Sequence, residues 1–506
     1  MEEIRRTAGK HTAVSPLSGG PLRNAGLPHF SNILSVMDRQ GDAEVPPVAD
    51  TPMKGGKNRM VFSAKMKLAA ACILVAGAGA AEVVAQTSAG IDWPCWRGPN
   101  HDGTTSESMS TTWPKEGPPK LWARKIGQGY SSVVVSGNRA LTLGVAAERE
   151  RVYCLDTATG AALWETVLDD RKITGQSQST PATDGKVVVA VSVFGRMVAM
   201  DIATGKPLWS KFLKEDLNCK LGQYNWGSSP LLHKNLVILH NGLAFDITSG
   251  KPVWENKELR NHPNIPETYS TPVPFKLNGA DAILIRVAHM LICLDPDTGV
   301  EKWKAPRGDG TNRTDRVVIG DKILWSGLYF TTIARFSAKG AEVLTQFPLK
   351  LYLQDCIAYR GYVYIIPSGP VEPPVKDSYF LICFDPAEVI KSGKYDIWAK
   401  VQWGTATLQQ KEPNFPGKWI QRGGEGTVTW GTMSIAGDHI VHLTKDGLLV
   451  IARAGGGSFQ QVASARVFNY KFEKNTGVWS SPVVSHGRLY CKSGFGDIVC
   501  FDVRQR

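Results

Sequence analysis

Short apolar runs recur along most of the chain, and turn residues separate them. Typical runs cover residues 151–155, 186–193 and 236–240, and each is bounded by Gly, Asp or a Ser-Pro-like pair. Runs of this length, rich in Val, Ile and Leu, are typical of β-strands. Gly and Pro, at 51 and 30 residues of 506, indicate many turns rather than long helices. The pattern therefore predicts an all-β protein built from short strands.

One turn motif follows four of these strands. It places Asp first, Gly four residues later and Trp eight residues later, and the Asp-to-Asp spacings are 45, 45 and 49 residues. The four copies are Asp156, Gly160 and Trp164; Asp201, Gly205 and Trp209; Asp246, Gly250 and Trp254; and Asp295, Gly299 and Trp303. A period of this length holding four strands predicts one propeller blade per repeat.

Weaker copies of the repeat fill the rest of the chain. They cover residues 316–340, 353–385, 430–453 and 479–502, which brings the number of units to eight. The last unit lacks an outer strand, whereas residues 120–126 form an unassigned one with Trp122 in the Trp position. We therefore predict an eight-bladed β-propeller of four-stranded antiparallel blades over residues 120–506. The N-terminal outer strand closes the ring and covers a sheet edge.

The motif has a structural interpretation. Its Asp can accept hydrogen bonds from backbone N–H groups of its own turn, and its Gly supplies a positive φ. The Trp is expected to cover the neighbouring blade and to bury about 150–250 Å² of surface. These residues are therefore predicted to hold blades together.

The N-terminal region is predicted to direct export. Lys65 and Lys67 precede an apolar stretch at residues 68–81, and Val-Val-Ala before Gln86 fits a cleavage site. We expect residues 60–85 to be a signal peptide, residues 1–59 a non-native or disordered extension, and residues 86–119 an extended segment. The alternative is a single membrane anchor with a short cytoplasmic tail. Export would place the protein in the periplasm or outside the cell.

Charge and composition narrow the function classes. The chain is 42% hydrophobic and 21% charged, which excludes a disordered protein. Residues 86–506 hold 48 Lys and Arg against 39 Asp and Glu, a net charge of +9 without runs of like charge. A diffusely basic exported protein fits this pattern better than a nucleic-acid-binding one. We expect a monomer with no membrane span after signal cleavage.

The Asp-x-x-Thr-Gly-x-x-x-Trp turn resembles the tryptophan-docking motif of the quinoprotein-like propellers, the pyrroloquinoline quinone (PQQ) repeat family. The opening from Trp93 to Asp102-Gly103, with Arg97 inside it, also resembles the start of exported bacterial members. The resemblance implies one of two functions. One branch contains non-enzymatic propellers similar to the scaffold lipoprotein of the outer-membrane barrel-assembly machinery. The other contains PQQ-dependent alcohol dehydrogenases, including polyvinyl alcohol-type enzymes.

The residues favour the non-enzymatic branch. The chain has no adjacent Cys-Cys pair, no Cys-x-x-Cys-His haem motif and no assignable calcium or other metal set. We therefore expect a binding or scaffold module of the cell envelope, with an envelope protein or a small molecule bound at the channel mouth. The alternative is a PQQ-dependent alcohol dehydrogenase with bound Ca²⁺.

Candidate ligand-binding residues precede the innermost strands, where propeller connections line a channel mouth. They are Tyr130, Gln178, Trp226, Tyr269, Trp430 and Trp479. An aromatic mouth would suit a flat quinone, a sugar or a peptide. The alternative is that these side chains pack the tops of the blades.

Three further residues could act in the same region. Arg422, in a long excursion at 404–429, could pair with a carboxylate ligand. Asp315 or Glu267 could serve as a catalytic base if the protein oxidises alcohols. The excursion could form a lid over the mouth or a surface insertion.

One disulfide is conceivable. A turn at Gly494–Asp497 would place Cys491 directly opposite Cys500 on the neighbouring strand, within reach of a bridge in an oxidising compartment.

Overall fold

The computed structural model describes residues 90–222, 225–263, 269–287, 290–306, 316–326, 331–347, 356–366, 380–392, 417–422, 431–470 and 480–505. The chain divides into the units Met1–Ala81 and Glu82–Arg506, and the first lies outside the described residues. The predictions of a signal peptide and of an N-terminal extension therefore stay predictions. Within the described residues, no helix is both long and apolar enough to cross a membrane.

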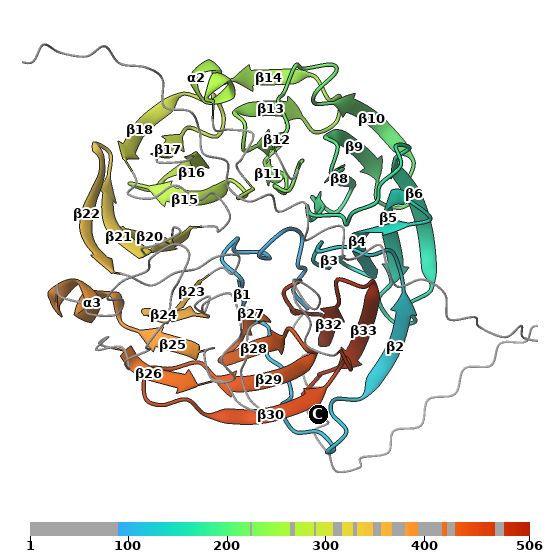
Figure 1. Cartoon of the computed structure of the whole chain (residues 1–506), viewed down its shortest axis with the longest axis vertical. Helices are drawn as coiled ribbons and strands as arrows, with labels where there is room; N and C mark the ends of the chain where they lie inside the picture. The colour runs from blue at the N-terminus through green and yellow to red at the C-terminus, as the bar shows by residue number, and fades with distance from the viewer. Residues whose placement is uncertain are drawn as a thin grey trace, which may run out of the picture. The chain divides into compact units, whose positions relative to one another are not determined.

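The second unit is a ring of eight sheets, which confirms the predicted eight-bladed propeller (Figure 1). The first four blades follow the four strong repeats. Blade 1 contains β3 (Val134–Ser136), β4 (Arg139–Ala146), β5 (Arg149–Asp156) and β6 (Ala162–Asp169). Blade 2 contains β7 (Ala182–Thr183), β8 (Val187–Val191), β9 (Arg196–Asp201) and β10 (Pro207–Phe212). Blade 3 contains β11 (Leu231–His233), β12 (Leu236–Leu239), β13 (Leu243–Asp246) and β14 (Pro252–Glu255). Blade 4 contains β15 (Val273–Leu277), β16 (Ala280–Val287), β17 (Met290–Leu294) and β18 (Glu301–Pro306).

The weaker repeats form the other four blades. Blade 5 contains β19 (Val317–Ile319), β20 (Lys322–Ser326), β21 (Thr331–Ser337) and β22 (Gly340–Phe347). Blade 6 contains β23 (Ile357–Tyr359), β24 (Tyr362–Ile365), β25 (Phe380–Phe384) and β26 (Gly417–Arg422). Blade 7 contains β27 (Gly431–Ala436), β28 (His439–Thr444), β29 (Leu448–Arg453) and β30 (Gln461–Arg466). Blade 8 contains β31 (Val483–Ser485), β32 (Arg488–Lys492) and β33 (Asp497–Asp502). Two short helices, α2 (Lys257–Asn261) and α3 (Pro386–Ser392), follow blade 3 and β25.

The N-terminal strand β2 (Lys120–Lys125) closes the ring, as predicted. It pairs antiparallel with β33 and places Trp122 opposite Cys500. A second short strand, β1 (Thr104–Thr105), pairs in parallel with β27 and gives blade 7 a fifth strand. Strand β1 was not predicted, because two residues are too few to show a periodic pattern.

Eight hydrophobic clusters make up the core, one at each junction between neighbouring blades. Alternate residues of one strand enter different clusters: Val189 packs against blade 3, whereas Val188 packs against blade 1. Both faces of each sheet are therefore buried, which explains why the inner strands read as continuous apolar runs.

The repeated Trp packs on the turn of the next blade. The Trp122 indole N–H donates to the Thr157 carbonyl at 2.9 Å, and those of Trp164, Trp209 and Trp254 donate to Ile202, Ile247 and Pro296. Gly160 has a φ of +69°, and a Cβ there would lie 2.6 Å from the Trp122 ring. Each motif Gly therefore serves the Trp of the preceding blade as well as its own turn.

A β-bulge precedes the repeated Trp position. The register between the third and fourth strands shifts in all eight blades, for example between Ala162 and Trp164. Such a bulge adds local twist and re-aims the following side chain. The eight-residue spacing from Asp to Trp therefore includes one unpaired residue.

The sixth blade corrects the interpretation of residues 404–429 as an irregular excursion. Residues Gly417–Arg422 form its outer strand, and Trp419 donates from its indole N–H to the Gly455 carbonyl of blade 7 at 2.7 Å. The prediction missed this Trp because the insertion containing α3 separates it from Asp385. The segments 393–416 and 423–430 lie outside the described residues.

The proposed cross-strand disulfide does not fit the register. Cys491 lies opposite Val499, and Cys500 lies opposite Tyr490, so the two cysteines are one residue out of phase. They point to opposite faces of the sheet, into the junctions of blade 8 with blade 7 and with blade 1, and both thiols are free. A one-residue slip in the turn at Ser493–Asp497 is enough to separate them.

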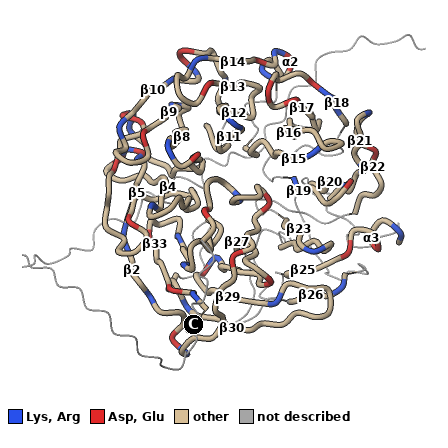
Figure 2. Tube along the Cα trace, turned by 180° about the vertical axis from the view of Figure 1, so that it is seen from behind, with Lys and Arg blue, Asp and Glu red and all other residues tan. Residues whose placement is uncertain are grey.

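Charged residues are spread around the ring. Stretches of Lys and Arg and stretches of Asp and Glu are interspersed around the ring in the view from behind (Figure 2). Neighbouring strands and turns of the described residues therefore carry both positive and negative charges.

Candidate binding site on the mouth face

The antiparallel blades give the ring two different faces. One, the turn face, carries the turns between the first and second strands and between the third and fourth strands of each blade. The other, the mouth face, carries the turns between the second and third strands and the connections between blades. All predicted mouth residues in the described segments belong to connections on the mouth face.

Hydroxyl groups tie the starts of the inner strands to one another. The Ser132 N–H donates to Thr180 Oγ1 at 3.0 Å, the Thr180 N–H to Ser229 Oγ at 2.9 Å, and the Ser229 N–H to Thr271 Oγ1 at 3.2 Å. Ser480 Oγ donates to the Ser131 carbonyl at 2.9 Å and so continues the series from blade 8. In blades 1–4, the Ser/Thr-Pro-like starts are therefore tied together next to the mouth residues.

Gln178 and Tyr269 meet on the mouth face over blade 3. A Cβ placed on Gly227 would lie 2.8 Å from Gln178 Oε1 and 2.9 Å from Tyr269 Cδ1. Both side chains are partly exposed, so a polar amide and an aromatic ring lie next to each other at the surface. We call Gln178, Gly227 and Tyr269 the mouth patch. The prediction missed Gly227, since a glycine beside a predicted Trp gives no signal of its own.

Trp226 is buried, whereas Tyr130 is partly exposed, like Gln178 and Tyr269. Burial raises the pKa of Tyr130 to about 12, so the phenol keeps its proton at physiological pH. Trp226 is 3% exposed, donates from its indole N–H to the Ser228 carbonyl at 2.8 Å and packs against His240. Trp226 therefore supports the mouth from below and does not present its ring to a ligand.

The other predicted site residues cannot be placed. Trp430, Trp479, Asp315 and Glu267 lie outside the described residues. Arg422 is the last residue of β26, opposite Phe380, and its side chain also lies outside the described part.

The centre of the ring is occupied by residues 93–105, which we call the central segment (Figure 1). Trp93 bridges to Val135 of blade 1, the Pro94 carbonyl accepts from Thr183 of blade 2, and Thr104–Thr105 pair with blade 7. The buried Arg97 donates to the Cys356 carbonyl, at the start of β23, at 2.8 Å. The segment therefore enters from the turn face and reaches the mouth end of an inner strand of blade 6.

Within the central segment, Cys95 and His101 lie together. The Cys95 Sγ and His101 Nδ1 atoms are 3.4 Å apart. Burial raises the pKa of Cys95 to about 12, and burial together with the Arg97 charge lowers that of His101 to about 4. A neutral thiol and a neutral imidazole result, which favours a structural contact over a nucleophilic pair.

A buried lysine lies at the junction between blades 8 and 1. Lys492 is 1% exposed, and its amine donates to the Gly129 carbonyl at 2.6 Å, next to Tyr130. Desolvation lowers its pKa to about 7. The sequence offered a weak signal here, namely a lysine at the end of an apolar strand.

The described residues show no cluster of candidate metal ligands. They contain no group of three or more His, Cys, Asp or Glu side chains that could hold a metal. Trp226, one of the predicted mouth aromatics, is 3% exposed and donates from its indole N–H to the Ser228 carbonyl. The part of the mouth face that the structure describes is therefore suited to binding through the mouth patch.

Sequence comparison assigns the family. A model described as outer membrane protein assembly factor BamB matches residues 110–262 and 148–367, together just over half of the 506-residue chain. The chain belongs to this PQQ-repeat propeller family. No curated protein matches the chain in sequence.

Solved structures share the fold at low identity. BamB from Moraxella catarrhalis is 15% identical, covers 76% of this chain and 98% of its own, and has a TM-score of 0.48. A quinohemoprotein alcohol dehydrogenase from Comamonas testosteroni is 14% identical, covers 82% of this chain and 81% of its own, and has a TM-score of 0.56. A europium-containing methanol dehydrogenase is 11% identical, with coverages of 79% and 89% and a TM-score of 0.56. Identities this low show a common fold only.

Proposed function

We propose that this BamB-family propeller is an exported binding or scaffold module of the cell envelope that holds its partner on the mouth face. The mouth patch carries the proposal. Gln178, which leads into blade 2, and Tyr269, which leads into blade 4, both lie against Gly227 of blade 3 and stay partly exposed. An amide next to an aromatic ring can bind a peptide segment through a hydrogen bond and apolar contact.

The family model and the missing cofactor features support binding rather than catalysis. The chain has neither a Cys-Cys pair nor a Cys-x-x-Cys-His motif. The predicted catalytic bases Asp315 and Glu267 lie outside the described residues, so they support neither function.

A glycine substitution tests the site. Gly227→Leu would clash with Gln178 and Tyr269 and displace both side chains, whereas Gly175→Ala lies in a mouth-face connection where a Cβ meets nothing within 4 Å. We expect Gly227→Leu to abolish, and Gly175→Ala to keep, the co-purification of one defined partner from envelope extract. Equal binding by both variants would place the partner elsewhere.

A titration tests the enzymatic alternative. PQQ with Ca²⁺ is added to the purified protein, and tryptophan fluorescence is recorded. Saturable quenching at micromolar PQQ, followed by alcohol-dependent dye reduction, would contradict the scaffold proposal and favour a dehydrogenase. We expect no quenching.

A further inference from the structure

Two carboxyl groups are buried side by side on the mouth face, at the junction between blades 1 and 2. Glu150 and Asp169 are 0% and 1% exposed, and they lie opposite each other where β5 pairs with β6. When two carboxyl groups are buried next to each other, each of them needs either a positively charged partner or a bound proton.

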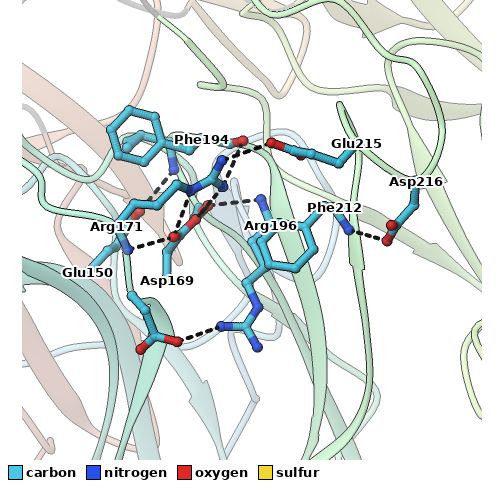
Figure 3. Close-up of polar contacts among 11 residues, drawn as sticks. Glu150, Asp169, Arg171, Phe194, Arg196, Phe212, Glu215 and Asp216 are labelled. Carbon is cyan, nitrogen blue, oxygen red and sulfur yellow. Dashed lines mark hydrogen bonds and ion pairs between the residues drawn. The ribbon is translucent and has the colours of Figure 1, made fainter.

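Only Asp169 is fully satisfied. Its Oδ1 accepts from the Arg171 backbone N–H at 3.0 Å and from Nε at 2.9 Å, and its Oδ2 accepts from Arg171 Nη2 at 2.7 Å and from Ser192 Oγ at 2.8 Å. Glu150 Oε2 accepts from the Val193 N–H at 2.9 Å, whereas its buried Oε1 has no hydrogen-bond partner. Figure 3 shows this difference, with Arg171 reaching Asp169 and Glu215 and not Glu150.

The charges around the pair leave Glu150 without a counterion. Arg171 is bidentate on Asp169 and packs against the Phe194 and Phe212 rings, 5.0 and 5.4 Å from their centroids. The other cations of this region pair elsewhere. Lys172 pairs with Glu148 at 2.7 Å, and Arg196 pairs with Asp170 at 3.7 Å.

The two carboxyl groups therefore titrate very differently. Burial raises the pKa of Glu150 to about 8, the Val193 N–H opposes this, and the Asp169 charge adds to it. Burial alone would raise the pKa of Asp169 as well, but the hydrogen bonds from Arg171 and Ser192 hold it below its usual value. One proton thus resides on Glu150 at neutral pH.

The pair holds the connection that leads to the mouth patch. Residues 170–181 run from β6 to β7, and Arg171 anchors their start on Asp169. The Ile173 N–H donates to the Glu148 carbonyl at 3.0 Å, and the Ser177 carbonyl accepts from the Tyr130 N–H at 2.8 Å. Gln178 of the mouth patch follows directly. Through Val193, Glu150 also ties this region to the turn of blade 2.

We propose that protonated Glu150 is a latch that holds the 170–181 connection in place, and that losing this proton loosens the connection and moves Gln178. A neutral Glu150 accepts from Val193 and leaves the Asp169–Arg171 pair undisturbed. An ionised Glu150 adds a second buried negative charge that the one guanidinium cannot also neutralise. The latch goes beyond the proposed scaffold function and does not depend on which partner binds.

Hydrogen exchange measured by mass spectrometry on the full chain tests the latch. Opening would return Glu150 to an ordinary pKa and so release a proton above pH 4.5, which makes opening easier as pH rises. Between pH 6 and pH 9, after correction for intrinsic exchange rates, peptides covering 170–181 and 192–196 should lose protection by about tenfold or more. Peptides covering the turn between β12 and β13 of blade 3 serve as the internal reference, and their protection should not change.

Two variants make the test specific. Glu150→Gln keeps an acceptor for Val193 but cannot ionise, so the pH effect on both peptides should disappear. Glu165→Gln removes an exposed carboxyl from the same strand as Asp169 and should behave like the native protein.

Three results would overturn the latch. The first is a pH effect that persists in Glu150→Gln. The second is an equal pH effect in the blade 3 reference of the native protein, which can be read even if the variant fails to fold. The third is full protection of the native protein at pH 9 on adding Na⁺ or Ca²⁺, because a cation and not a proton would then neutralise Glu150.

Discussion

Polar side chains on the turn face of the blades are well hydrogen-bonded, whereas several on the mouth face are buried with few hydrogen-bond partners. On the turn face, Asp156 Oδ1 accepts from the backbone of Ala158 and Thr159 and from the Thr159 hydroxyl, which lower its pKa. The same arrangement recurs at Asp201 and Asp246. On the mouth face, Glu150 and Lys492 are buried with too few partners, and their pKa values move toward neutrality, to about 8 and about 7.

This difference agrees with the proposal that the mouth face holds the binding site. A turn whose polar groups are hydrogen-bonded within the turn does not depend on its surroundings. It can therefore recur in many blades, and this turn is the motif that repeats along the chain. Buried charges with few partners reduce stability, so proteins keep them mainly where they matter for activity or binding. The mouth face is therefore where function is to be sought.

The largest expected effect comes from removing the Trp that closes the ring. Trp122→Ala should reduce the free energy of unfolding by about 3–5 kcal/mol, because it removes a buried indole and its bond to Thr157. Leu121→Ala, at an exposed neighbouring position, should change it by less than about 0.5 kcal/mol. Denaturant unfolding measures both. Equal losses would mean that β2 does not close the ring through Trp122.

On the mouth face, Lys492 should make stability rise with pH. Its folded pKa of about 7 lies below the ordinary lysine value of 10.5, so the folded state binds fewer protons than the unfolded state between these values. This group should therefore add about 2 kcal/mol of stability from pH 7 to pH 9, at about 1.4 kcal/mol per pH unit. Lys492→Met should remove that part of the pH dependence, as urea unfolding at both pH values would show.

The matched control is Lys125→Met, at an exposed lysine of β2. It should leave the slope unchanged. The same slope in Lys492→Met and in the native protein would show that the buried amine is charged in the folded state.

A smaller effect separates backbone strain from packing on the turn face. Gly160 and Gly137 both have positive φ, +69° and +56°, but only a Cβ on Gly160 meets the Trp122 ring. Gly160→Ala should therefore be destabilised by about 1–2 kcal/mol more than Gly137→Ala in thermal unfolding. Equal effects would mean that Trp122 can shift without loss.

The repeats made the fold predictable, but features that do not repeat could not be predicted in the same way. Asp156 and Trp164 recur with one spacing, so the number of blades and the closing strand followed from the sequence. The prediction missed Trp419 as a member of the repeated Trp position, because an insertion breaks that spacing. The register of Cys491 and Cys500 depended on one residue in a turn, which composition does not determine.

The site was harder to predict because its contacts are long-range and unique. Arg97 donates to Cys356, 259 residues away. Glu150 is bound by Val193 of the next blade. Neither contact has a counterpart in another repeat that could have revealed it.

The smallest expected effect lies at the junction where the motif is broken. Trp254 donates its indole N–H to the Pro296 carbonyl at 3.0 Å, whereas the Trp303 Nε1 is buried without a partner and faces blade 5, which lacks the Asp-x-x-Thr-Gly turn. Trp254→Phe leaves a carbonyl unsatisfied and should cost about 1 kcal/mol more in free energy of unfolding than Trp303→Phe. Both replacements remove similar apolar surface, because both side chains are less than one-tenth exposed. Urea unfolding of the two variants isolates the hydrogen bond. If Trp303→Phe costs as much as Trp254→Phe, packing alone joins these blades, and the repeated turn matters for its shape rather than for its carbonyl.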